Sequence, residues 1–201
     1  MNTSPGNKDR IIGQKRPLQI SHISGIRIRL ELEGKTRDLA LFNMALDSKL
    51  RGCALVNLKV SDVAYGSSVS SRATMLQQKT GSPVQLEITK GTREAVAALI
   101  KLGNLHSKDF LFRSRIGTNR HISTRQYSRI FHGWVEKLGL EASIYSIHSI
   151  RRTKPYLIYK KTKYLRVIQL LLGHKKLEST VRYLGIEVDD ALEISESMIK
   201  V

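Results

Sequence analysis

One part of the chain, residues 59 to 90, breaks the hydrophobic period that the rest of it follows. Before and after this segment, apolar residues recur at the three- and four-residue spacing of amphipathic helices. Within it, residues 60–64, 73–77 and 84–89 alternate between apolar and polar side chains as short strands do, and turn residues separate them. We therefore expect a mainly α protein with a small three-stranded antiparallel sheet, which is an α+β fold.

The helical spacing also gives approximate bounds for the helices. We expect two helices between residues 22 and 50, one from a cap at Thr92 to Leu102, one from Ser123 or Thr124 to Leu138, and three more over 147–159, 165–172 and 177–183.

The size and charge of the chain limit its function. With 201 residues it is long enough for one domain with a real core. A net charge of +17 points first to nucleic acid, because cations that neutralise phosphates release counterions and strengthen binding. A membrane surface is the main competitor, but no apolar run reaches the length of a spanning helix. The single cysteine fits a reducing compartment, so we expect a soluble, intracellular binder of polyanions.

The two ends of the chain differ in composition. Residues 1–21 are basic and contain several prolines and glycines, which predicts a flexible arm that lies on phosphates or is simply unstructured. Residues 22–183 make up the predicted globular domain. Residues 184–201 form an acidic amphipathic segment, predicted to be a helix that folds back on its own domain or docks on a neighbouring protomer.

The positive charge is concentrated between residues 142 and 177, where there is no Asp or Glu but there are nine Lys or Arg. Such a field would attract and hold an anionic substrate. Eight of these cations are predicted DNA contacts: Arg152, Lys154, Lys160, Lys161, Lys163, Arg166, Lys175 and Lys176.

Six side chains could converge on one phosphate: Arg51, Lys79, His148, Arg151, His174 and Tyr183. Two planar guanidinium groups can bond the non-bridging oxygens and stabilise the charge of the transition state. A tyrosine offers an oxygen nucleophile, and a lysine can donate a proton to a departing 5′ oxygen. Lys59 and Lys90 remain alternatives to Lys79, since the hairpin register is not determined by the sequence. No acidic cluster has the spacing of a two-metal site, and no metal or cofactor is predicted.

The segments that carry these residues resemble a known family. HSIRR (148–152) followed by LLGHKKLESTVRY (171–183) is similar to the His-x-x-Arg, Leu-Gly-His and Thr-x-x-Tyr signature of the tyrosine recombinases, the phage-integrase family. LRGCALVNLKVSDV (50–63) resembles the arginine box of the same family. The resemblance covers nearly the whole chain and implies the catalytic-domain fold of that family.

The resemblance also implies a role for each candidate. Arg51 and Arg151 would clamp the scissile phosphate of double-stranded DNA, and His174 would bond a non-bridging oxygen. His148 would act as a base or orient the nucleophile. Tyr183 would form a 3′-phosphotyrosyl bond and Lys79 would protonate the 5′ hydroxyl, with no metal or nucleotide. Members of the family work as tetramers on DNA, which implies a homo-oligomer and a cytoplasmic, nucleoid-associated protein.

The chain departs from the family pattern at two positions. Ala54 stands where the family usually has Glu or Asp, and Pro155 stands at a helical position where a small residue is usual. Two alternative functions therefore stay open at this stage. One is a DNA-binding protein with a weakened site, and the other is a type IB topoisomerase, which reseals its own strand.

Overall fold

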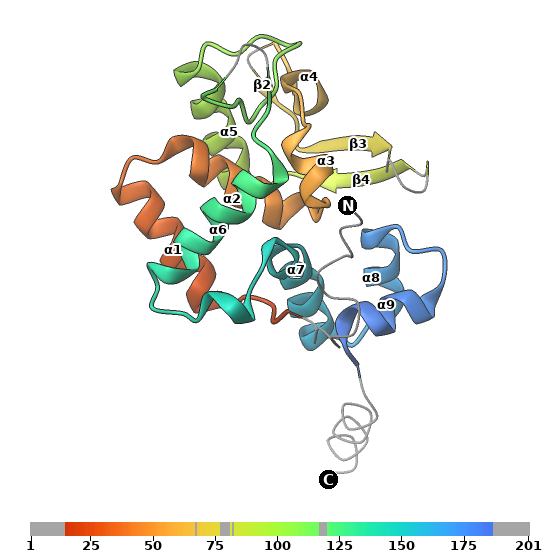
Figure 1. Cartoon of the computed structure of the whole chain (residues 1–201). Coiled ribbons are helices and arrows are strands. Elements are labelled where there is room, and N and C mark those ends of the chain that lie inside the picture. Colours follow the sequence, from red (N-terminus) through yellow and green to blue (C-terminus); the bar gives the residue numbers. More distant parts are fainter. Residues whose placement is uncertain (1–14, 67, 77–80, 82, 117–119, 187–201) are drawn as a thin grey trace, which may run out of the picture.

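The computed structural model describes residues 15–66, 68–76, 81, 83–116 and 120–186. Helices dominate, and two small hairpins lie on one side of them (Figure 1). The elements in chain order are α1 (Ile20–Leu32), α2 (Thr36–Ser48), α3 (Gly52–Val56), α4 (Val60–Val63), β1 (Ala64–Tyr65), β2 (Ser68–Val69), β3 (Arg72–Leu76), β4 (Pro83–Glu87), α5 (Lys90–Leu102), α6 (Thr124–Glu136), a 3₁₀ turn (Ala142–Ile144), α7 (Ile147–Thr162), α8 (Leu165–Leu172) and α9 (Leu177–Leu184). The predicted mainly helical fold with a small antiparallel sheet is confirmed.

The strands differ from the prediction in one detail. In the described ranges they form two separate antiparallel pairs, β1 with β2 and β3 with β4, instead of one three-stranded sheet. The first predicted strand, residues 60–64, is mostly the short helix α4. Its first turn is closed by Asp62, whose carboxylate accepts the backbone N–H of Lys59 at 2.8 Å. Val60 and Val63 are three residues apart and both buried, so the apparent alternation was one turn of helix.

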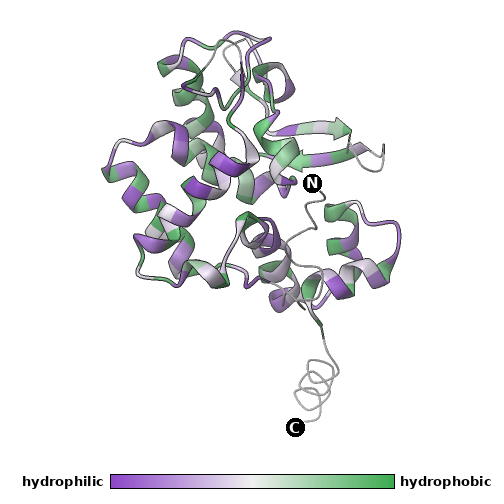
Figure 2. Ribbon diagram, in the orientation of Figure 1, coloured by the Kyte–Doolittle hydropathy of each residue, from purple (hydrophilic) through white to green (hydrophobic). Residues whose placement is uncertain are grey.

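The main core is built around α2. All residues from Ala40 to Ser48 are buried, and α1, α5 and α7 pack around them. Phe42 meets Trp134 edge to face, with ring centroids 5.5 Å apart. Figure 2 shows that the outer helices carry both hydrophilic and hydrophobic residues, as expected for helices that cover a core on one face.

A second, smaller core joins the last three helices. Tyr159 of α7, Ile168 and Leu172 of α8, and Leu184 of α9 are buried together. In Figure 1, α8 and α9 lie beside α7, below the β3–β4 hairpin. Helix α7 therefore takes part in both cores, and residues on its buried face lie between them.

Several predicted boundaries shift. Thr89, not Thr92, is the N-cap of α5, because Thr92 lies in the first turn with its hydroxyl turned to Asp47. Helix α7 continues through Pro155 to Thr162. Helices α8 and α9 are close to prediction, and α8 ends at Gly173 with a positive φ of 64°.

Part of the predicted arm, residues 1–21, packs against the rest of the domain. Leu18 is buried, its N–H donates to Thr153 Oγ1 at 2.9 Å, and α1 begins at Ile20. Residues 1–14 of the arm and 187–201 of the predicted acidic helix lie outside the described residues.

Candidate active site

The first turn of α7 presents two of the predicted residues. Ser146 caps the helix by accepting the N–H of His148 at 3.2 Å, and Ser149 Oγ accepts the N–H of Ser146 in return. This reciprocal cap determines where the helix begins. His148 and Arg151 follow one turn apart, so both lie on the same face of α7.

Arg151 and Arg152 are both buried, at 7% and 8% exposed, but their surroundings differ. Arg152 donates to the carbonyls of Lys15 at 2.8 Å and Leu184 at 3.2 Å, and so ties α7 to the N-terminal segment and to the end of α9. The Nε atoms of both Arg151 and Arg152 have no hydrogen-bond partner among the described residues. Burial lowers the pKa of Arg151, although the negative forms of Tyr183 and Cys53 oppose this shift. Leaving a buried donor unpaired costs free energy, which is recovered when an anion binds it.

Tyr183 lies on α9 with its ring close to both arginines. The centroid of the ring is 5.7 Å from Arg151 Cζ and 5.8 Å from Arg152 Cζ. Its hydroxyl is buried without a hydrogen-bond partner in the part of the chain that the structure describes. Burial raises the pKa of Tyr183 to about 12, although Arg151, Arg152 and Arg51 lower it. The phenol is therefore protonated at neutral pH and needs a base before it can act as a nucleophile.

His174 packs against the tyrosine. It follows Gly173, and its ring meets the ring of Tyr183 edge to face, with centroids 5.5 Å apart. Its Nδ1 lies 3.1 Å from the buried hydroxyl of Thr180, which holds the ring in place. Burial, Arg151 and Arg51 lower the pKa of His174 and also that of His148. Both imidazoles are therefore neutral near pH 7 and able to accept a proton.

Arg51 reaches the same place from another part of the chain. It is the N-cap residue of α3, and its charge affects the pKa values of His148, Arg151, His174 and Tyr183. The next residue, Gly52, permits this approach, because a Cβ there would lie 2.7 Å from Cδ1 of Ile147 at the start of α7.

The structure thus brings five of the six candidates together: Arg51, His148, Arg151, His174 and Tyr183. The sixth, Lys79, lies outside the described residues. The cluster holds two cations, two neutral imidazoles and a hydroxyl that has no hydrogen-bond partner in the described ranges. This is a suitable set for transferring a phosphoryl group to an oxygen.

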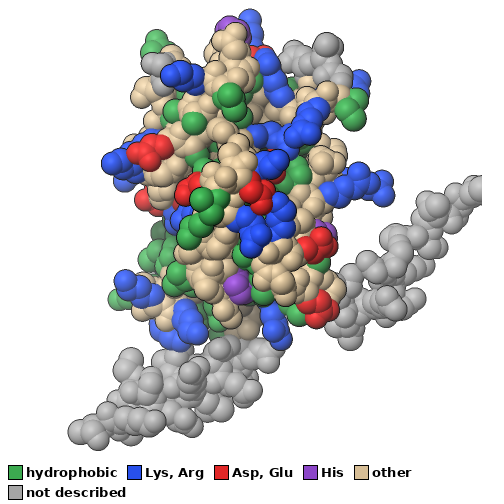
Figure 3. All heavy atoms as spheres, turned by 90° about the vertical axis from the view of Figure 1, so that its left-hand side faces the viewer, with side chains coloured by type: hydrophobic (Ala, Val, Ile, Leu, Met, Phe, Trp, Pro, Cys, Tyr) green, Lys and Arg blue, Asp and Glu red, His purple; other side chains and the backbone are tan. Residues whose placement is uncertain are grey.

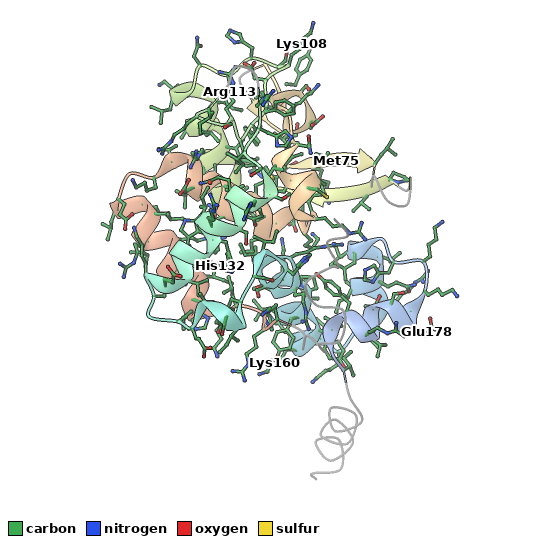
Figure 4. The ribbon with its side chains drawn as sticks, in the orientation of Figure 1. Met75, Lys108, Arg113, His132, Lys160 and Glu178 are labelled. Carbon is green, nitrogen blue, oxygen red and sulfur yellow. The ribbon has the colours of Figure 1, made fainter. Side chains whose placement is uncertain are left out.

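Most of the predicted DNA contacts are exposed: Lys160, Lys161, Lys163, Arg166, Lys175 and Lys176. Figure 4 shows Lys160 pointing away from the body at the far end of α7. The other two predicted DNA contacts, Arg152 and Lys154, are bonded within the protein. Arg152 is buried on backbone carbonyls, and Lys154 pairs with Asp47 and Glu87 at 3.2 Å each. Figure 3 shows that Lys and Arg also cover the face that carries α1, where Asp and Glu lie among them.

A buried carboxylate, Asp47, lies near the site and was not among the residues predicted from the sequence. Asp47, 3% exposed, accepts from the N–H of Thr89 at 2.9 Å and from the hydroxyls of Thr89 and Thr92 at 2.7 and 2.6 Å. Burial alone would raise the pKa of Asp47, but these bonds and the charge of Lys154 lower it overall. Asp47 therefore links the end of α2 to α5 and, through Lys154, to the helix of Arg151. The available signal was an acid at the end of an otherwise apolar helix.

Lys49, beside this network, is 3% exposed and adopts a positive φ of 54°. Its Nζ donates to the carbonyl of Asp47 at 2.8 Å. Burial and the charge of Lys154 lower the pKa of Lys49 to about 8, while Asp47 and Glu87 oppose the shift.

This lowered pKa predicts an unusual alkaline stabilisation. The folded protein releases the proton of Lys49 near pH 8, while the unfolded chain keeps it up to about pH 10.4. The unfolded state binds more protons between these values, so stability rises with pH there. From pH 7.5 to 9.5 the free energy of unfolding in urea should increase by about 2 kcal/mol relative to a Lys49→Met variant. The variant keeps every tyrosine, so the comparison isolates the lysine; a constant difference between the two proteins would contradict the prediction.

The described residues show neither a membrane-spanning helix nor a metal-binding cluster. None of the described helices is long and apolar enough to cross a membrane. No group of three His, Cys, Asp or Glu side chains within the described ranges lies close enough together to hold a metal ion.

The chain resembles proteins of known family. A model of the phage integrase family matches residues 22–188. The chain is 28% identical over 158 residues to the probable integrase/recombinase YoeC of Bacillus subtilis, which covers 79% of this chain and 82% of that protein. It is 27% identical over 190 residues to the tyrosine recombinase XerC of Chlamydia trachomatis serovar L2, covering 86% of this chain and 54% of that protein. The chain thus spans about half the length of XerC.

Solved structures agree on the fold. The XerA recombinase superposes with a TM-score of 0.75 at 19% identity, over 94% of this chain and 67% of that one. The XerH recombinase bound to its difH substrate gives 0.70 at 17% identity, over 92% of this chain and 55% of that one. Together with the match over residues 22–188, these likenesses show that the chain belongs to the phage integrase family.

Proposed function

We propose that this chain is a site-specific DNA recombinase or integrase that cleaves and rejoins strands through a 3′-phosphotyrosyl intermediate. The observation that carries the proposal is the buried hydroxyl of Tyr183, which has no hydrogen-bond partner among the described residues and lies beside Arg151 and His174. A phosphate placed there would meet the free Nε of Arg151. The similar Tn1549 transposon integrase, solved in complex with transposon right end DNA, supports DNA as the substrate class.

The proposed reaction follows from these groups. Tyr183 Oη attacks the phosphorus, a phosphorus–oxygen bond to the tyrosine forms, and the bond to the 5′ oxygen breaks. A neutral imidazole takes the phenol proton; family resemblance favours His148, while His174 is the histidine in ring contact with Tyr183. Arg51 and Arg151 stabilise the charge on the non-bridging oxygens. Lys79, as the proposed acid, protonates the leaving 5′ oxygen.

The covalent bond would keep the energy of the phosphodiester, so attack by a 5′ hydroxyl from a second duplex could reseal the strand without nucleotide hydrolysis. We propose that this exchange takes place in a homo-tetramer on DNA, with residues 187–201 as the segment that docks on a neighbouring protomer. Exposed cations such as Lys160, Lys161 and Arg166 would position the DNA backbone. A DNA substrate implies action in the cytoplasm, at the nucleoid.

A suicide substrate tests the proposal. A duplex nicked just beyond the cleavage point loses a short 5′-hydroxyl fragment after attack, so the covalent complex cannot be reversed. We expect a protein–DNA band that survives detergent and maps to the peptide of Tyr183 by mass spectrometry. A library of nicked sequences is needed because the target site is unknown. Tight binding of a duplex with no adduct at any nick position would instead identify a non-catalytic DNA-binding protein, consistent with Ala54.

A further inference from the structure

A cavity of about 300 Å³ adjoins the candidate active site. It lies among the segment after α2, helix α3, the β3–β4 hairpin and helix α8. Its wall is mostly apolar, with Leu50, Ala54, Met75, Val84, Leu171 and Leu172 among the lining residues. Met75 is labelled on β3 in Figure 4. The cavity is large enough for a small organic molecule.

Cys53 also lines this cavity. It is the one cysteine of the 201 residues, and its side chain is exposed. It lies within α3, and its carbonyl accepts the side-chain amide of Asn57 at 2.9 Å. An exposed thiol on a rigid element can react with a molecule that enters the cavity.

The charged residues of the cavity are all cations. Arg51, Arg151 and Lys49 line it, and no Asp or Glu is among the described residues that do. Arg151 is 7% exposed, and its Nε lacks a partner in the described part of the chain. Cys53 and Arg151 line the same cavity. The thiol therefore shares the cavity with apolar side chains and with a buried cation whose Nε has no hydrogen-bond partner among the described residues.

We propose that Cys53 is a modification site for small anionic disulfides, which the cavity arginines direct to the thiol. The thiolate attacks one sulfur of the disulfide, a new S–S bond forms at Sγ, and the other half leaves with the electron pair as a thiolate. The proton of Cys53 goes to solvent. The protein thiol is oxidised and the leaving half is reduced, so no other reactant is required. The attached half brings its carboxylate to Arg51 and Arg151.

Modification would block the reaction of the neighbouring tyrosine. A carboxylate bound to the two arginines occupies the donors that a scissile phosphate needs, so the modified protein would not transfer strands. This second part rests on the proposed function, whereas the reaction of the thiol does not.

The rate of modification tests the site on the full chain alone. Two disulfides of similar size and opposite charge are compared, 3,3′-dithiodipropionate and cystamine, with the adduct followed by intact mass at pH 8. The quantity compared is the rate of Cys53 modification by the anionic disulfide divided by the rate with the cationic one. This ratio should be about tenfold higher for the folded protein than for the same chain unfolded in urea, and it should fall with added salt. Arg51→Gln should lower the ratio, while Arg166→Gln, which removes an equal charge outside the cavity lining, should leave it unchanged. Equal ratios in the folded and unfolded chain would overturn the proposal.

DNA cleavage tests the blocking effect. After labelling with dithiodipropionate, adduct formation on the nicked duplex should drop at least about tenfold and return after reduction with dithiothreitol. Cys53→Ser should cleave DNA at the unlabelled rate and resist the reagent. A labelled chain that cleaves at the unlabelled rate would overturn the blocking effect. If the unlabelled chain forms no covalent adduct with DNA, the proposed function is contradicted. The ratio of modification rates then still tests the Cys53 site.

Discussion

A Tyr183→Phe variant is expected to form no covalent adduct with a nicked duplex while folding at least as stably as the natural chain. Adduct formation is lost because the substitution removes the nucleophilic oxygen and nothing else. The free energy of unfolding does not fall, because that oxygen is buried. It has no hydrogen-bond partner among the described residues, so the natural chain carries the desolvation cost of a buried, unpaired hydroxyl. Such a group costs about 1–3 kcal/mol, and the phenyl ring avoids this cost.

Two measurements check this prediction. Adduct formation is read on a denaturing gel, and the free energy of unfolding is measured by urea titration. Tyr164→Phe is the matched control, because Tyr164 is 68% exposed and lies outside the cluster; it should keep full adduct formation. An adduct formed by Tyr183→Phe at the natural rate would assign the nucleophile to another residue and refute the proposed chemistry.

An Arg151→Ala variant is expected to lose adduct formation by at least about a thousandfold while its affinity for duplex DNA changes only a few-fold. Removing one preorganised donor from a developing oxyanion costs about 10² to 10³ in rate, and here a full buried charge is removed as well. Binding persists because many exposed cations contact the backbone independently of this residue.

The matched control for this variant is Arg166→Ala on α8. It removes an equal charge from an exposed position, where the guanidinium bonds Gln169 at 2.7 Å, so binding and adduct formation should fall together by a small factor. Arg151→Lys should recover part of the binding but little of the rate, because an ammonium lacks the planar fork. If Arg151→Ala reduced binding and adduct formation equally, the residue would be a backbone contact and not a group that stabilises the transition state.

Parts of the candidate site were predictable because they depend on residues close together in the chain. His148 and Arg151 share a face of α7 through the helical repeat, and Gly173 ends α8 just before His174. The order of motifs therefore identified the family and the side chains that the structure brings together. The predicted strand over 60–64 was wrong for a local reason. Two valines three residues apart suit either a strand or one turn of helix, and the cap by Asp62 favours the helix.

Other features depended on contacts between distant residues. Arg151, Arg152 and Lys154 belong to one basic run in the sequence, yet the structure gives each a different environment. Arg152 bonds the carbonyl of Lys15, 137 residues away, and Lys154 pairs with Asp47, 107 residues away. Arg151 lies beside the ring of Tyr183 instead, and its Nε has no hydrogen-bond partner among the described residues.

The helical period, the family and the set of reactive side chains follow from the amino-acid sequence alone, because each of these is encoded in residues a few positions apart. Contacts between distant segments establish which cations are already paired, how Asp47 links three helices, and that Cys53 shares a cavity with Arg51 and Arg151. Burial and pairing depend on which distant segments come into contact, and the free energy of an unpaired buried group is determined only when those contacts are made.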